Sequence, residues 1–415
     1  MRDSGAMEVF GYGRRKAPRA ALVWSIPSEV ACAGAFYPAP VSEKLYCSNM
    51  NTWSALFTDL GLDAPDVITP DQFDSLDPER YPLVVMPLTR MLSEKQIAYL
   101  KRYVRSGGTL ISDYAPGVVD QFGALLETSP LSELFGAEIA PAGAPGRGEL
   151  YLGKHRLSAA IPGNPLKLYG KAVAAGALKQ TVQGFSVGGI HLESSTTAVA
   201  PAVILNSYGK GKTLYLNAIL PDYEFDKEEK GRALRTMARN IFTLAGVDMA
   251  GAHTLPNGAN YAEYSYAGVR YLFVSRRHNE SSGIFELKIK GKYHIYEMLS
   301  GKYAGYGSSV KGTLKPAEIR MYCLSSGKLP DSFKSSIGCD GRRFRISFSQ
   351  SGFPGTLFQI KIFHNGREVR KLGSVCAVEN GKSVVIDGGL ELSGVYRIEL
   401  IRIPDRKKVV KTFKY

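Results

Sequence analysis

The segment Tyr81–Tyr114 constrains the fold more than any other part of the chain. It contains an apolar strand (YPLVVMP), a helix that begins at Ser93 with Gln96 in the capping-box position, and a second apolar strand (TLISDY) that follows Gly107–Gly108. Two strands that are apolar on both faces and joined by one helix are typical of a parallel sheet with a right-handed crossover. We therefore expect an α/β fold with a doubly wound parallel sheet.

Strand and helix signals extend this sheet in both directions along the chain. The run AALVWS (Ala20–Ser25) predicts a strand with Trp24 in the core, and a long loop that holds Cys47 is expected after it. The next helix carries its apolar stripe on Trp53, Leu56, Phe57 and Leu60. After a region of short strands, SYGKGKTLYLNAIL (Ser207–Leu220) predicts a buried strand and Asp226–Ala245 a helix.

The pattern after residue 249 is of β type throughout. Alternating strands separated by Gly, Asn and Ser clusters are followed by a linker-like break at Ser325–Ser332 and by a set of strands with the spacing of a small sandwich. Asn365–Gly366 predicts a type I′ hairpin turn. We expect an N-terminal extension at 1–19, an α/β domain at 20–249, a small β domain at 250–328 and an Ig-like β-sandwich at 329–415.

Charge and cysteine usage exclude several classes of function. The formal net charge is +14, but no zinc-finger spacing, RNP-like motif or phosphate-binding glycine loop accompanies it, so a solvated basic surface is expected rather than nucleic-acid binding. The cysteines lack CxxC spacing, which argues against a disulfide framework and a zinc site, and we expect no cofactor and no metal. No signal peptide or membrane span is recognisable, so a cytoplasmic protein is expected, unless the chain is cut from a longer secreted one.

The turn after the strand TLISDY is where an open α/β sheet would place its chemistry. It offers Asp113, Tyr114, Ala115, Pro116 and Gly117 in place of a Ser or Cys nucleophile. One interpretation is that Asp113 and Tyr114 act together with Asp222, Tyr223 and Glu224, whose strand could end at the same edge, so that two carboxylates activate water. The other is that Asp113 caps the following turn through its side-chain oxygen.

The order of these segments resembles a known family. The segment YPLVVMPLTRMLSEKQIAYLKRYVRSGGTLISDYAPGVVD, followed by YGKGKTLYLNAILPDYE and LRTMARNIFTLAGV, is similar to the class I glutamine-amidotransferase-like domain, called the trimerisation domain, of family 42 β-galactosidases. The resemblance covers roughly Ala20 to Ser325. It implies a homo-oligomer or a glycosidase partner and a carbohydrate ligand, with no nucleic acid and no membrane.

The resemblance also implies where catalysis would lie. In family 42 the chemistry belongs to a TIM barrel of about 250 residues that precedes the trimerisation domain, and only nineteen residues precede the first strand here, so the barrel is expected to be absent. An amidotransferase needs a Cys and a His at the strand ends, and neither is found there. We expect a non-catalytic accessory or assembly protein linked to carbohydrate metabolism; the alternative is a hydrolase that uses Asp113 and Asp222.

Overall fold

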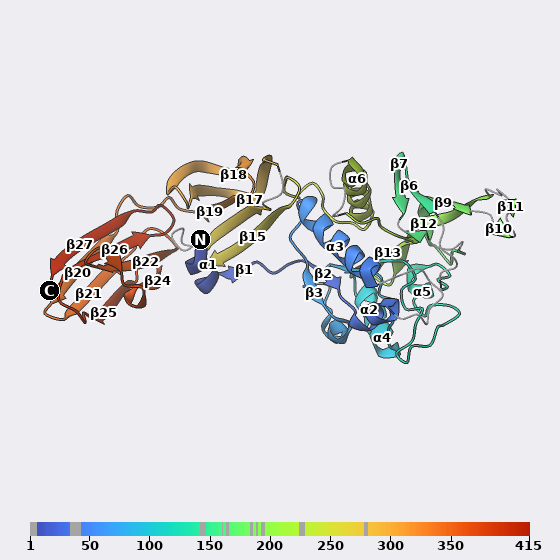
Figure 1. Cartoon of the computed structure of the whole chain (residues 1–415), viewed down its shortest axis with the longest axis horizontal. Coiled ribbons are helices and arrows are strands. Elements are labelled where there is room, and N and C mark those ends of the chain that lie inside the picture. Colours follow the sequence, from blue (N-terminus) through green and yellow to red (C-terminus); the bar gives the residue numbers. More distant parts are fainter. Residues whose placement is uncertain are drawn as a thin grey trace. The chain divides into compact units, whose positions relative to one another are not determined.

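The computed structural model describes residues 6–33, 43–141, 147–159, 161–162, 166–182, 186–187, 190–191, 196–223, 229–277 and 281–415. The chain divides into two compact units. One unit is Pro18–His253, and the other combines the N-terminal residues up to Ala17 with Thr254–Tyr415. Figure 1 shows both units and labels many of their helices and strands.

A nine-stranded mixed sheet forms the centre of the unit Pro18–His253. Five neighbouring strands are parallel and lie in the order β3-β2-β4-β5-β13, so the chain reverses its direction of travel across the sheet between β2 and β4. These strands are β2 (Ala20–Val23), β3 (Asp66–Ile68), β4 (Leu83–Met86), β5 (Thr109–Asp113) and β13 (Gly211–Leu216).

Four antiparallel strands complete this sheet, which is therefore not the wholly parallel sheet that the sequence predicts. They are β12 (Thr196–Tyr208), β9 (Val173–Val182), β6 (Arg147–Leu152) and β7 (His155–Ala159). The direction changes because β12 joins β13 through a two-residue turn at Gly209, whose φ is 63°, and such a turn can only connect antiparallel strands. Two small ladders pair β8 (Ile161–Pro162) with β14 (Ala218–Ile219) and β10 (Ser186–Val187) with β11 (Ile190–His191).

Helices cover both faces of the parallel part. On one face, Leu22 and Ile111 pack against the apolar stripes of α3 (Glu43–Asp59) and α6 (Glu229–Leu244), and on the other, Val84 and Leu110 pack against Leu100 of α4 (Glu94–Arg105). The remaining helices are α2 (Ile26–Ala33), α5 (Ser132–Phe135) and the short 3-10 helix η2 (Pro70–Ser75). The capping box predicted for α4 is present: Ser93 Oγ accepts from the Gln96 amide, and Gln96 Oε1 accepts from the Ser93 amide.

Two predictions for the first loop region are wrong. Because β2 already ends at Val23, Trp24 does not continue the strand; it is 46% exposed and donates through Nε1 to Glu29. The long loop expected after Ser25 contains helix α2 and the first turns of α3, so Cys47 lies on a helix. The sequence did not predict these helices because α2 is short and the first turns of α3 are polar, so neither shows a clear helical spacing of apolar residues.

The N-terminal residues form regular structure that the sequence did not indicate. Helix α1 (Ala6–Tyr12) packs inside the second unit: Val9 is fully buried, and the ring of Phe10 lies 4.8 Å from that of Phe273. Strand β1 (Arg14–Arg15) then pairs with β15 (Ala259–Tyr266). A single helix of seven residues is too short to display a helical period in the sequence, so its order depends on the tertiary contacts.

The second unit begins with a six-stranded antiparallel sheet in the order β1-β15-β16-β19-β17-β18. Its larger strands are β15 (Ala259–Tyr266), β16 (Val269–Arg276), β17 (Gly283–Glu297), β18 (Lys302–Leu314) and β19 (Ile319–Ser325). Apolar side chains fill both faces, with one cluster around Tyr271 and Cys323 and another around Phe285 and Leu324.

Two further sheets follow and face each other across a core of their own. One contains β20 (Lys334–Asp340), β21 (Arg343–Ser349) and β25 (Ser383–Gly389), and the other β22 (Gly355–His364), β23 (Arg367–Glu368), β24 (Ser374–Glu379), β26 (Val395–Arg402) and β27 (Lys408–Lys414), with the 3-10 helix η3 at Arg370–Leu372. Phe348 of β21 contacts Phe358 of β22 with ring centroids 4.8 Å apart. The predicted turn has positive φ at Asn365 and Gly366, as a type I′ turn requires.

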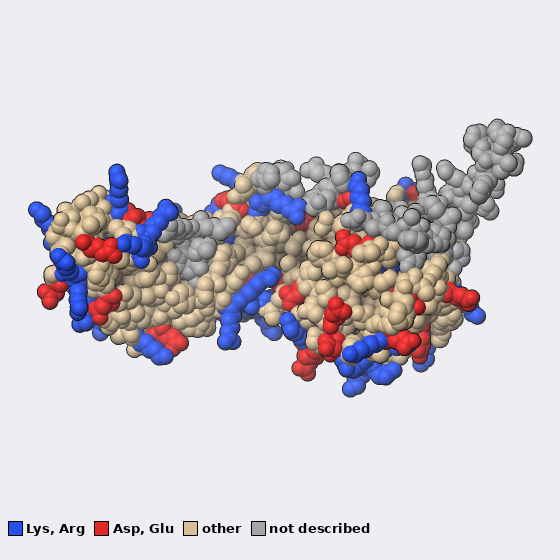
Figure 2. All heavy atoms as spheres, turned by 60° about the horizontal axis from the view of Figure 1, so that its bottom comes forward, with Lys and Arg blue, Asp and Glu red and all other residues tan. Residues whose placement is uncertain are grey.

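The surface charges are mixed. On the face drawn in Figure 2, Lys and Arg side chains are interspersed with Asp and Glu rather than gathered in one patch. In the described part of the chain, no helix has the length and apolar character needed to cross a membrane.

The segment Ser332–Tyr415 is expected to fold by itself, because its two sheets enclose a separate apolar cluster that includes Phe344, Ile360 and Ile398. Expressed alone, it should give a sheet-type circular dichroism spectrum and a cooperative melt. It should be less stable than in the full chain, because buried Arg402 loses the carbonyl of Pro330 as an acceptor, at a cost of about 1–3 kcal/mol. A spectrum typical of a disordered chain would contradict this boundary.

Candidate functional site

The carboxyl ends of the parallel strands meet along one edge of the sheet, where ligands and catalytic groups of open α/β sheets are usually found. Asp113 is the last residue of β5 and lies opposite Leu216 of β13 in the ladder. The turn that follows Asp113 therefore lies at this edge, and its strand β5 lies between the buried strands β4 and β13.

Asp113 is fully buried and surrounded by hydrogen-bond donors. Its Oδ2 accepts from Asn49 Nδ2 at 2.7 Å and from Trp53 Nε1 at 2.8 Å, both on α3. Its Oδ1 accepts from the backbone amide of Leu88, at 2.6 Å, in the turn after β4. The carboxylate thus links α3, the β4 turn and β5, and it does not cap the turn that follows it. With no exposed surface, it has no open approach for a substrate or a water nucleophile.

Burial dominates the electrostatics of this carboxyl group. It raises the pKa of Asp113 to about 6, although the hydrogen bonds from Asn49, Leu88 and Trp53 act in the opposite direction. At neutral pH the group is therefore an anion that is stabilised by three donors. This arrangement is suited to holding three elements in register.

The turn after Asp113 presents no nucleophile. The strained position is Ala115, whose φ is 52°, and its amide donates to the hydroxyl of Tyr215 at 3.3 Å. Tyr114 is 1% exposed, and burial raises its pKa to about 12, which leaves it a neutral phenol. Among the described residues, no hydrogen-bond partner reaches the Tyr114 hydroxyl.

Two cysteines lie on the helices α2 and α3. Cys32 on α2 is buried, and burial raises its pKa to about 11 despite the neighbouring Arg90, so it stays protonated at neutral pH. Cys47 is exposed on α3, and its thiol donates to a carboxylate oxygen of Glu29 at 3.5 Å.

The second group of candidates is held by other residues. Tyr223 is 1% exposed; its hydroxyl donates to Asp59 at 2.6 Å and accepts from Arg235 at 2.9 Å, and burial raises its pKa. Asp222 is half-buried beside it, and Glu224 lies outside the described residues. The hydrogen bonds of Tyr223 and those of Asp113 go to different residues, so they form two separate networks.

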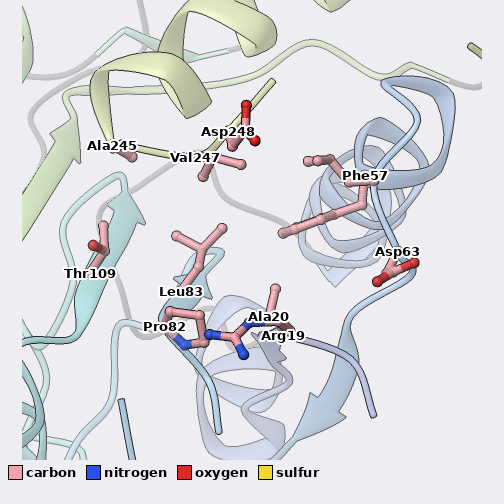
Figure 3. Close-up of a pocket in the computed structure, with 12 residues that line it drawn as sticks. Arg19, Ala20, Phe57, Asp63, Pro82, Leu83, Thr109, Ala245, Val247 and Asp248 are labelled. Atoms are coloured by element: carbon pink, nitrogen blue, oxygen red, sulfur yellow. The ribbon is translucent and has the colours of Figure 1, made fainter. Parts of the chain in front are cut away.

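A hollow of about 300 Å³ lies at the opposite, amino edge of the sheet (Figure 3). Phe57, Leu83 and Val247 point toward its middle, whereas the carboxylates of Asp63 and Asp248 lie on different sides of it. Four residue steps separate Thr109 in its wall from Asp113, roughly 13 Å along the strand. The carboxylates do not converge, so the hollow has apolar contact surface and no paired acid and base.

Side chains that bind a metal ion together must lie close to one another. Across the described ranges, no group of three or more His, Cys, Asp or Glu side chains could hold a metal ion.

Residues 18–229 match the protein family described as the beta-galactosidase trimerisation domain. The matched range is just over half of the chain. The chain belongs to this family. The matched residues contain the whole parallel part of the sheet, with Asp113 and all of its hydrogen-bond partners.

Several proteins that are similar to this chain are β-galactosidases. BglY of Alicyclobacillus acidocaldarius is 28% identical over 217 residues, which are 48% of this chain and 28% of that protein. A catalytic mutant of Gan42B, a GH42 β-galactosidase of G. stearothermophilus, has a similar structure, with a TM-score of 0.57, 20% identity and coverage of 74% of this chain and 40% of that one. For the β-galactosidase of Bacillus circulans sp. alkalophilus the TM-score is 0.57, the identity 17% and the coverage 78% and 43%.

The likeness in structure extends past the trimerisation domain. Coverage of 74% is more than the unit Pro18–His253 can supply, so part of the second unit also matches. The chain spans less than half of the length of each of these relatives.

Sequence reasoning found Asp113 but missed the residues that define its role. Asn49 was not singled out, and Trp53 was predicted to be core, which is confirmed, without its hydrogen bond. A signal was available: Asn49 stands four residues before Trp53 and so lies on the same face of the helix, an unusual place for a buried amide. Nothing in the sequence indicates that the Leu88 amide, at a φ of 41°, turns toward the carboxylate.

We expect Asp113→Asn to destabilise the unit Pro18–His253 by about 1–3 kcal/mol at pH 7, because an amide nitrogen would face one of the three donors.

The stability of the wild type should also depend on pH through Asp113. The native pKa near 6 lies above the value of about 3.9 in an unfolded chain, so the folded state binds the proton more tightly. The stability that this group contributes is therefore present below pH 4 and is lost as the pH rises through 6.

Denaturant unfolding at several pH values measures this effect. The stability difference between the wild type and Asp113→Asn should grow by up to about 3 kcal/mol from pH 7 to pH 4, with exposed Asp74→Asn as the matched control that shows no such trend. If the stability difference instead shrank toward pH 4, the hydrogen bonds to Asp113 would lower its pKa by more than burial raises it.

Proposed function

We propose that this chain is a non-catalytic accessory protein of carbohydrate metabolism that acts by assembly, either with copies of itself or with a glycosidase. The membership in the trimerisation-domain family supports the assembly role and the link to carbohydrate. The single observation that carries the non-catalytic part is the sealed carboxylate of Asp113, which three donors occupy at the edge where chemistry would be expected.

We further propose that the α/β part is a class I glutamine-amidotransferase-like domain with an emptied active site. The parallel strands in the chain order 2-1-3-4-5, with helices on both faces, support a flavodoxin-like, doubly wound arrangement at 20–249. The strained turn with Ala115 in place of a nucleophile supports the loss of activity. The domains that follow would be a small β domain at 250–328 and an Ig-like sandwich at 329–415.

A hydrolase that uses Asp113 with Asp222 is the alternative. The raised pKa of Asp113 is the observation in its favour, since a general base or acid works best with a pKa near the operating pH. The complete burial of Asp113 weighs against it, because a substrate could reach the carboxylate only after α3 had moved away.

The emptied turn predicts that the chain releases no ammonia from glutamine. An assay coupled to glutamate dehydrogenase, run beside a working amidotransferase as positive control, should stay at background. Ammonia release that disappears when the cysteines are alkylated would contradict the proposal, and the variants Cys32→Ser and Cys47→Ser would then identify the thiol.

The assembly role predicts a mass above that of one chain. At micromolar concentration, light scattering should give a multiple of 45.2 kDa, because a stable interface of about 1,000 Å² or more holds subunits together at that dilution. The measurement should be repeated with a family 42 β-galactosidase added. A particle of 45.2 kDa that persists in both samples would contradict assembly and favour the hydrolase.

A further inference from the structure

A second site lies at the carboxyl edge of the sheet, away from Asp113. A hollow of about 200 Å³ is formed by the loops that follow β2, β3, β4 and β5, so four separate connections contribute to its wall. At about 30 Å³ for each water molecule, it has room for about seven waters. That is the scale of one small ring rather than of an oligosaccharide or a nucleotide.

The position of this hollow follows from the strand order. The chain leaves β2 toward β3 on one side and then returns to β4 on the other, so the loops after β2 and β4 run in opposite directions and leave a crevice between them. Such a reversal point at the carboxyl ends is where open α/β sheets bind their ligands. Ile26 and Pro27 after β2, and Met91 and Leu92 after β4, line the two sides.

Polar groups converge on the hollow from three loops. Asp71 comes from the loop after β3, Gln96 from the first turn of α4 and Gln121 from the segment after β5. Gln96 is held in place, because its Oε1 accepts from the Ser93 amide at 2.9 Å and its Nε2 donates to Asp71 at 3.4 Å. Gln121 is exposed at the rim of the hollow, where its amide can reach a ligand, whereas Thr69 caps the short helix η2 together with Gln72.

The charge of the lining restricts the ligand. Of the described residues around the hollow, Asp71 is the only one with a formal charge, and no Lys or Arg is among them. A phosphate or carboxylate would meet an anion with no cation to balance it. A carboxylate beside two amides and a hydroxyl can instead accept from and donate to several hydroxyl groups, while prolines, Met91 and Leu92 offer an apolar floor.

We propose that this hollow binds a small uncharged polyol of the size of one sugar ring, with Asp71, Gln96 and Gln121 as its polar contacts and Pro27 and Pro70 under its apolar face. The site adds ligand binding to the proposed accessory role and does not depend on assembly. A module of this kind would sense or retain a monosaccharide without reacting with it, because Asp71 is the only carboxylate among the described residues that line the hollow.

Saturation-transfer NMR on the full chain tests the proposal with D-galactose, D-glucose and putrescine as separate probes, and phosphorus NMR line broadening tests inorganic phosphate, which has no observable protons. One of the two sugars should bind in the millimolar range. Asp71→Asn should weaken that binding roughly tenfold, since a hydrogen bond to a charged group is lost. Gln121→Trp should abolish it by filling the hollow.

Asp74→Asn is the matched control, because Asp74 is exposed on the same short helix η2 and does not line the hollow. Thermal melts of all variants establish that they fold. Sugar binding that survives both Asp71→Asn and Gln121→Trp, or an absence of sugar binding to the wild type, would overturn the proposal. Binding of putrescine or phosphate in place of the sugars would also overturn it, since the site would then select charge.

Discussion

The unit Pro18–His253 depends on one buried carboxylate. Taking an ionised group out of water is costly unless donors replace the lost hydration, and Asp113 recovers part of that cost through two side chains of α3 and one backbone amide after β4. The dependence is mutual, because the Trp53 indole and the Leu88 amide would be buried without an acceptor if the carboxylate were absent. The position of α3 over the sheet is therefore set by charge and hydrogen bonding as well as by its apolar stripe.

Helix α3 also forms hydrogen bonds with other loops at the carboxyl edge of the sheet. The Tyr46 hydroxyl accepts from the amide of Ser25 just after β2, and the Thr52 hydroxyl accepts from the amide of Tyr223 after β13. One helix thus contacts the ends of β2, β5 and β13, and its register is fixed at three places. The Asp113 carboxylate at this edge has a donor on both oxygens, which is the arrangement expected of a structural group rather than of a reactive one.

The sequence correctly predicted features that depend on neighbouring residues, such as helix caps, helix faces and tight turns. The capping box at Ser93, the stripe that contains Trp53 and the turn at Asn365–Gly366 are each determined by residues within a few positions of one another, and all three are confirmed. The errors arose where distant contacts decide. Helix α1 is ordered by a sheet some 250 residues away, and Trp24 is exposed because β2 ends one residue earlier than its apolar run.

The same distinction explains how much of the candidate site could be predicted. A strand-end turn with Asp113 is visible in the sequence, but its partners lie 25 to 64 residues away, so whether the carboxylate is open or sealed depends on tertiary structure. Along one edge of one sheet, the Asp113 carboxylate at the end of β5 is fully buried by its three donors. The hollow farther along this edge is lined by exposed Asp71 and Gln121. Since a ligand can reach exposed groups but not a fully buried carboxylate, the proposed ligand binding belongs to the reversal point and not to the turn that the sequence first suggests.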